Sequence, residues 1–256
     1  ETIVPKGLRC SQLSFNFTIR NINIGEMIMK KANRIIKVLI ASLAILCFQV
    51  LYYQLTVVLL QKSAEVLPAM SNDCYLMLHH TYEFLLVFLL TLLICNFKHI
   101  DFGYHIKDWK KGLLWGCTAI TFQILVRIIL NIAYGFRGLH FQADTFIFQL
   151  FFSGFGEEIL FRSVPFAILP LAWGDEMSIS IGSKFKVYID LLISALFFSL
   201  AHISFQFGVS GISFNWIQIS SAFVMGIFIG MVFKKTNSVW TCMIIHGIVN
   251  AIAVTM

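Results

Sequence analysis

The chain has 256 residues, of which 58% are hydrophobic and only 12% are charged, and its formal net charge is +6. Soluble domains average about 25% charged residues, so this composition excludes an ordinary soluble protein and indicates a membrane protein. The basic residues are spread between apolar runs, so no nucleic-acid partner is expected. The six cysteines lie far apart without a C-x-x-C pair, which disfavours a disulfide framework and a structural zinc site.

The N-terminal residues 1–36 are polar, mixed in charge and without periodicity. We expect them to form a disordered cytoplasmic segment. Because Met27 and Met29 precede a basic stretch and an apolar run, translation is expected to begin at one of them, with residues 1–28 upstream of the true start. The rest of the chain, 37–256, is predicted to be a single membrane-embedded domain.

Seven apolar stretches follow one another after residue 37, and a transmembrane helix needs about 20 such residues. The sequence therefore predicts an all-α fold, a polytopic bundle of about seven transmembrane helices. The fourth stretch is long and contains Pro165, so we expect it to bend or break before Leu169. The predicted spans are 38–60, 75–97, 112–134, 143–170, 187–206, 215–233 and 238–255.

Lysine and arginine residues in the predicted loops alternate strongly from one side of the membrane to the other. Cytoplasmic loops carry an excess of these residues. Twelve lie on the side of the N-terminus, against two on the other side, which predicts a cytoplasmic N-terminus and an external C-terminus. The twelve are Lys30, Lys31, Arg34, Lys37, Lys98, Lys107, Lys110, Lys111, Lys184, Lys186, Lys234 and Lys235; the two are Lys62 and Arg137.

The fourth stretch contains three ionisable residues, Glu157, Glu158 and Arg162. Ionisable groups at membrane depth are costly, and each is by default a candidate functional residue. Residues four apart share a helix face, so Glu158 and Arg162 can pair, which leaves Glu157 directed toward other helices. The alternative is a single charge-balancing network of all three that holds the bundle together.

Three further polar residues lie in the last spans: His202, and the pair His246 and Asn250, whose spacing places both on one face. Taken with Glu157, they supply a general base and several hydrogen-bond donors, as amide hydrolysis requires. Other polar residues have simpler interpretations. His79, His80 and Glu83 are expected at the membrane interface, and the G-x-x-x-G of Gly226 and Gly230 is expected to allow close helix packing.

Together these residues form three motifs in order, which are Glu157-Glu158-x-x-x-Arg162, Phe198-x-x-x-His202 and His246-x-x-x-Asn250. They resemble the motifs of the CAAX protease and bacteriocin-processing family, also called the Abi family, of intramembrane glutamic endopeptidases. The resemblance covers residues 143–256, the expected protease-family core. The short chain is more similar to the bacterial branch of that family.

The resemblance implies a role for each motif residue. Glu157 would activate a water molecule, His202 would hold and polarise that water, and His246 and Asn250 would stabilise the oxyanion. Glu158, Arg162 and Phe198 would be supporting residues. No cofactor is expected on this mechanism. The nearest rival is a zinc site with an open coordination position, made by Glu157, His202 and His246.

The function expected from these features is an intramembrane endopeptidase of the plasma membrane that processes a CAAX-like, bacteriocin-type or pheromone-type peptide. Its partners would be membrane lipid, a peptide or membrane-protein substrate, and a sensor kinase or peptide-secretion system. One alternative is a non-catalytic bacteriocin self-immunity or regulatory protein of the same fold. Another is a transporter, which the lack of paired interrupted helices in the two halves disfavours.

Overall fold

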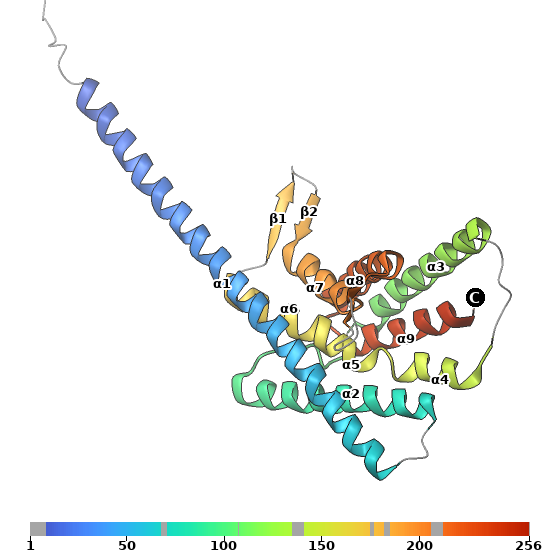
Figure 1. The fold of residues 1–256 in the computed structure, drawn as a ribbon. Helices are drawn as coiled ribbons and strands as arrows, with labels where there is room; N and C mark the ends of the chain where they lie inside the picture. The colour runs from blue at the N-terminus through green and yellow to red at the C-terminus, as the bar shows by residue number, and fades with distance from the viewer. Residues whose placement is uncertain are drawn as a thin grey trace, which may run out of the picture.

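The computed structural model is a helical bundle with two short β-ribbons (Figure 1). Among the residues that the structure describes, four helices are long and apolar enough to cross a membrane, and shorter apolar helices accompany them. The protein is therefore an all-α polytopic membrane bundle, as predicted. The structure describes residues 9–67, 71–106, 108–134, 141–174, 177–181, 185–205 and 212–255.

The helices and strands follow one another in this order: α1 (Arg9–Val66), α2 (Asn72–Lys98), α3 (Trp109–Tyr134), α4 (Ala143–Phe151), α5 (Phe155–Glu158), the π-helical turn η1 (Ile159–Ser163), α6 (Val164–Trp173), β1 (Ser178–Ile181), β2 (Phe185–Tyr188), α7 (Ile189–Leu200), β3 (Ser204–Phe205), β4 (Ile212–Ser213), α8 (Trp216–Thr236) and α9 (Val239–Thr255).

Helix α1 is much longer than the predicted first span. It begins at Arg9, so a helix replaces the disorder that we expected through most of the segment 1–36. Between Pro5 and Pro68 the chain has no proline, and a helix that has been nucleated in the membrane extends by one hydrogen bond per added residue. Residues 1–8 lie outside the described part of the chain. The division at residue 37 stays a prediction.

The predicted fourth span is the element that differs most from expectation. It is divided into α4, a turn at residues 152–154, α5, the turn η1 and α6. The first interruption includes Gly154, and glycine disfavours a helix interior. Pro165, at which we expected a bend, instead lies in the first turn of α6, where its missing N–H is tolerated.

The missing N–H of Pro165 leaves the Phe161 carbonyl without a donor from the next helical turn. Ser194 of α7 supplies that donor, with its Oγ 2.5 Å from the Phe161 oxygen. Gln49 of α1 donates to the neighbouring Leu160 carbonyl at 3.3 Å. Buried backbone groups need such partners, so the π-helical turn is held by side chains from two other helices.

The predicted fifth span, 187–206, is also corrected. Residues 185–188 form strand β2, which pairs antiparallel with β1 from Ser178 opposite Tyr188 to Ile181 opposite Phe185. The helical part is limited to Ile189–Leu200, too short to be counted among the four long candidate spans. The glycine-rich connection expected at 208–211 lies outside the described residues.

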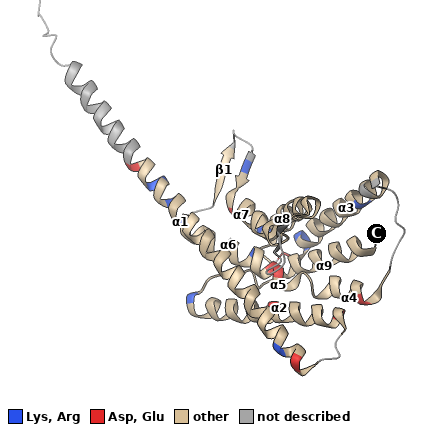
Figure 2. Ribbon diagram, in the orientation of Figure 1, with Lys and Arg blue, Asp and Glu red and all other residues tan. Residues whose placement is uncertain are grey.

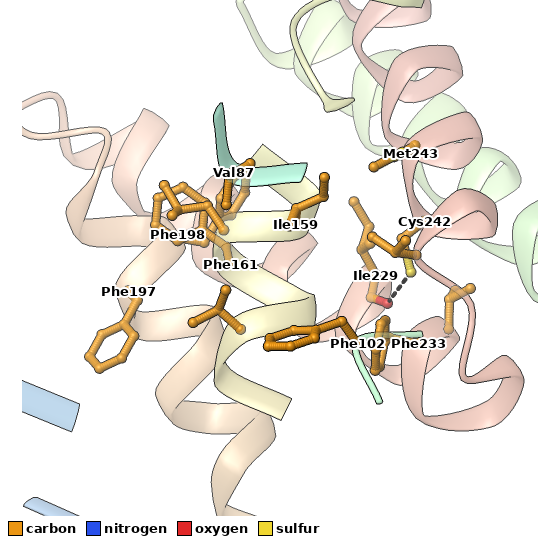
Figure 3. Packing of buried hydrophobic residues seen from close by; sticks show 14 of the residues in the cluster. Val87, Phe102, Ile159, Phe161, Phe197, Phe198, Ile229, Phe233, Cys242 and Met243 are labelled. Atoms are coloured by element: carbon orange, nitrogen blue, oxygen red, sulfur yellow. Dashed lines mark hydrogen bonds between the residues drawn. The ribbon is translucent and has the colours of Figure 1, made fainter. Parts of the chain in front are cut away.

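The core lies where the π-helical turn meets α7, α8 and α9 (Figure 3). Ile159 and Phe161 of the turn are buried there, and Phe161 packs against Phe198 with ring centroids 5.5 Å apart. On the far side the Cys242 thiol lies 3.6 Å from the Ile229 carbonyl, a contact that joins α9 to α8.

Helices α7 and α8 pack closely through the glycine motif, as predicted. A Cβ at Gly226 would lie 2.9 Å from the Cα of Ala195, so only glycine allows the two backbones to approach this far. Beyond this contact, Lys234 reaches Asp190 at 2.6 Å and lies over the rings of Phe166 and Tyr188. This ion pair joins the last turn of α8 to the first turn of α7.

Candidate active site

Acidic residues of α5 lie in the interior of the bundle (Figure 2), and two glycines explain how this segment fits there. A Cβ at Gly154 would lie 2.9 Å from Cγ of His246, so Gly154 allows α9 to bring its histidine against α5. A Cβ at Gly156 would lie 2.9 Å from the backbone nitrogen of Phe84. The segment therefore sits between α2 and α9 with close contact on both sides.

Glu158 is the centre of the buried charges and is fully inaccessible to solvent. Its Oε2 lies 3.3 Å from Nε of Arg162, the pair that the four-residue spacing predicted. Its Oε1 lies 2.6 Å from Nδ1 of His246, a contact that the sequence did not indicate. Because a carboxylate only accepts, Nδ1 of His246 donates the hydrogen, and the neutral ring then carries its lone pair on Nε2.

Glu157 points to a different set of groups. Its side chain is 25% exposed, and its Oε2 lies 3.8 Å from Nε2 of His246. The other titratable groups that act electrostatically on Glu157 are His80, Glu83 and His202. The structure therefore brings Glu157 together with two of the residues that the motifs singled out, and with two residues of α2 that were expected elsewhere.

Phe198 separates Arg162 from the histidines. The Arg162 guanidinium carbon lies 4.3 Å from the centre of its ring, a cation–π contact. The edges of His202 and His246 meet the same ring, with centroids 4.8 Å and 5.6 Å away. Among the described residues the guanidinium nitrogens of Arg162 have no hydrogen bond of good geometry, so Glu158 and Phe198 are the contacts that hold this buried cation.

His202 lies just after the end of α7, and its Nδ1 is 2.8 Å from the carbonyl of Phe198. A carbonyl only accepts, so Nδ1 donates and the neutral ring presents the Nε2 lone pair. Both His202 and His246 thus have their Nδ1 atoms occupied by fixed acceptors.

Asn250 lies one turn after His246 on α9, as predicted, but its partner is new. Its Nδ2 donates to Oγ of Ser153 at 3.1 Å, and Ser153 donates onward to the Gln149 carbonyl at 3.0 Å. Ser153 lies in the turn that interrupts the fourth span, and only a predicted break at Gly154 would have drawn attention to it.

His79, His80 and Glu83 have largely buried side chains. Their side chains are 12–15% accessible, and one ligand atom of each lies within 4.8 Å of the others. Within the described part of the chain this is the cluster whose ligand atoms converge closely enough for a metal ion; the trio of Glu157, His202 and His246, considered as a zinc site above, is not brought together in this way.

The fold and the site define a polytopic membrane protein with an acid–histidine cluster at the interior of the bundle. A family model described as "Type II CAAX prenyl endopeptidase Rce1-like" matches residues 139–252, a little under half of the chain. Over these residues the chain is similar to the Rce1-like family, a family of proteases, in agreement with the resemblance that the three motifs indicated. The matched segment contains every motif residue but excludes α1, α2 and α3. Comparisons with curated proteins and with solved structures gave no match.

Proposed function

We propose that the chain is an intramembrane endopeptidase in which Glu157 activates water for attack on a peptide bond. The observation that carries the proposal is the different environment of the two adjacent acids. Glu158 is buried and engaged by Arg162 and His246, whereas Glu157 is partly exposed and 3.8 Å from Nε2 of His246. Two groups at that separation can share one water molecule within hydrogen-bond distance of both.

The first step is deprotonation of this water. Glu157 accepts the proton as the water oxygen attacks the carbonyl carbon of the scissile bond. His202 helps to orient the water, because the Nε2 lone pair left by its bond to the Phe198 carbonyl can accept the water's second hydrogen. Glu157 then returns the proton to the amide nitrogen as the carbon–nitrogen bond breaks.

The second requirement is stabilisation of the oxyanion. Asn250 donates one amide hydrogen to Ser153, and its second amide hydrogen is directed away from that bond and can meet the oxyanion. His246, when protonated at both nitrogens, donates from Nε2 while Glu158 accepts from Nδ1. Donors held by packed helices need no reorganisation during the reaction.

The proposed substrate is a membrane-associated peptide, either a CAAX-like C-terminal segment or a bacteriocin-type or pheromone-type precursor. The Rce1-like match supports the first of these classes. Membrane lipid is the proposed surrounding, and a sensor kinase or peptide-secretion system is the proposed cellular partner. The mechanism proposed here requires no metal at Glu157.

The test compares wild type with Glu157→Gln in nanodiscs, using a farnesylated CAAX peptide and a bacteriocin-leader peptide as reporters. Loss of a general base lowers the rate by about 10²–10⁴-fold, so we expect at least about a hundredfold loss. The matched control is Glu65→Gln, since Glu65 is an exposed acid that pairs with Lys62 at the end of α1. Cleavage is followed by mass spectrometry.

Equal cleavage by wild type and Glu157→Gln would overturn the role of Glu157. If folded wild-type protein binds the peptides and cleaves neither, the non-catalytic alternative replaces the endopeptidase. A chelator added to the wild type separates the mechanisms, because the zinc rival requires an activity loss that zinc reverses.

We also propose a plasma-membrane location with the N-terminus in the cytoplasm, on the strength of the lysine and arginine distribution. This orientation places the start of α2 outside, where Cys74 is exposed. A variant that keeps Cys74 and replaces the other cysteines with serine should react with an impermeant maleimide on intact cells. The same variant carrying Cys74→Ser and Lys110→Cys should react only after permeabilisation, and the reverse pattern would invert the topology.

A further inference from the structure

Three residues of α2 form a convergent group outside the segment that matches the protease family. His80 Nδ1 lies 2.8 Å from Oε2 of Glu83, and His79 Nε2 lies 4.0 Å from Oε1 of the same carboxylate. The spacing explains the convergence, since residues three and four apart on a helix share a face. Imidazole and carboxylate are the ligands that zinc and similar divalent ions take.

The polar atoms of this group are short of partners. Among the described residues, His80 Nδ1 and Glu83 Oε2 are buried and meet each other at 2.8 Å, and neither has a further hydrogen bond of good geometry. Buried polar atoms are normally satisfied, and an exception needs an explanation such as an ion. The His80 ring packs edge-on against Phe148 of α4, with ring centroids 5.2 Å apart, so an aromatic side chain covers one side of the group.

Thr56 of α1 contacts the nitrogen of His79 that faces Glu83. The His79 Nε2 lies 3.1 Å from Oγ1 of Thr56, and the Thr56 hydroxyl directs its hydrogen to the Tyr53 carbonyl at 2.8 Å. The threonine oxygen can therefore accept from Nε2, which is also the nitrogen of His79 that lies 4.0 Å from Oε1 of Glu83. A cation bound by Nε2 would replace this hydrogen bond and lie next to the threonine oxygen.

The net negative charge around the group favours binding of a divalent cation. Glu83 and Glu157 act electrostatically on each other, and Glu158 lies beside Glu157 on the opposite side of His246. Arg162 supplies a positive charge to these three carboxylates through its ion pair with Glu158. Three ionised carboxylates and one guanidinium leave a formal charge of −2 when the histidines are neutral, which is costly inside a membrane protein.

We propose that His79, His80 and Glu83 bind one divalent transition-metal ion, of the zinc class, on the face of α2 that looks toward Glu157. Zinc bonds of about 2.0–2.2 Å require the three side chains to close by rotamer adjustment around the ion. The two positive charges of the ion would cancel the formal charge of −2. The site joins α2 to α1 through Thr56, and it is separate from the Glu157–His202–His246 set.

This inference does not depend on the proposed peptidase function, because it concerns binding and not cleavage. Its test uses the full-length protein in detergent, purified without a histidine tag and stripped with a chelator. Zinc is titrated against a chromophoric chelator, and bound metal is counted by mass spectrometry. Cobalt absorption in the visible range reports the nitrogen and oxygen ligands directly.

Glu83→Gln and His80→Ala are expected to weaken zinc binding by more than about tenfold. His105→Ala is the matched control, since His105 is partly accessible and lies beside Asp101 in the connection between α2 and α3. Glu157→Gln and His202→Ala, which alter the rival trio, should retain the ion. Zinc should also raise the thermal midpoint of wild type but not that of Glu83→Gln.

The proposal is overturned if stripped wild type elutes as a folded monodisperse protein and takes up no zinc. It is also overturned if Glu157→Gln or His202→Ala releases the ion while Glu83→Gln keeps it, since the metal would then belong to the other set. Glu83→Gln preserves the shape of the side chain. If this variant loses zinc while its far-ultraviolet circular dichroism spectrum is unchanged, the loss is due to the missing ligand and not to misfolding.

Discussion

Glu158 accepts a 2.6 Å hydrogen bond from Nδ1 of His246, although the two residues are 88 positions apart in the chain. This bond sets which nitrogen of His246 faces Glu157. The same carboxylate is the anion that Arg162 meets. Glu158 therefore links the first and third motifs, and the effect of changing it should spread to both.

The first prediction concerns the buried pair of Glu158 and Arg162. Arg162→Met leaves a buried carboxylate without its cation, and breaking such a pair costs about 3–5 kcal/mol of the free energy of unfolding. The double variant Glu158→Gln/Arg162→Met removes both charges, so it should be more stable than Arg162→Met alone. Chemical denaturation in detergent measures both, and equal stability of the two variants would mean that Arg162 acts independently of Glu158.

The second prediction concerns the close approach at Gly154. Gly154→Ala places a methyl group 2.9 Å from Cγ of His246. Overpacking of this kind costs about 1–3 kcal/mol and moves the imidazole away from Glu157. Peptide cleavage should fall at least about tenfold, since a small misplacement has a large effect on rate. Thr145→Ala, in the first turn of α4, where the hydroxyl donates to the exposed Gln142, should leave cleavage unchanged.

The third prediction assigns Ser153 as a positioning residue for Asn250. Ser153→Ala removes the 3.1 Å partner of the Asn250 amide and leaves the amide itself in place. Loss of one hydrogen bond of about 1 kcal/mol corresponds to a decrease of about fivefold, expected in kcat with KM little changed. Asn250→Ala should have a larger effect, and Ser153→Ala in that background should add nothing. Additive losses would show that the two residues act separately.

The fourth prediction concerns the ion pair that closes α7 against α8. Asp190 is buried and lies 2.6 Å from Lys234. Because this pair is largely buried, Asp190→Asn should lower the free energy of unfolding by about 2 kcal/mol. Lys62→Ala, which breaks an exposed pair with Glu65, should change it by less than about 0.5 kcal/mol. Thermal unfolding of the two variants compares them directly.

Local spacing predicted some features of the molecule well. The four-residue interval between Glu158 and Arg162 was enough to predict their pairing. The interval between Gly226 and Gly230 was enough to predict a close helix contact, which the structure shows between α8 and α7. Both predictions concern neighbours on one helix face, where geometry depends on the sequence interval alone.

Contacts between distant segments could not be predicted in the same way. The bonds from Glu158 to His246 and from Asn250 to Ser153 depend on how α9 lies against α4 and α5. His79, His80 and Glu83 have the spacing of a ligand set, but their place near a helix end suggested only a position at the membrane interface and not the burial of their side chains against other helices. Only the packing of α1 and α4 over α2 shows that these residues face inward.

The interruption at residues 152–154 has a consequence for how the backbone tolerates the lipid environment. Irregular backbone at membrane depth persists only where protein covers it or where it borders an aqueous cavity. Here the Leu150 carbonyl is pressed against Gly247, and the Gln149 carbonyl accepts from Ser153. The Ser153 hydroxyl then leads to Asn250. Protein groups therefore cover this turn, so the chain can break beside the site at membrane depth without exposing its peptide groups to lipid.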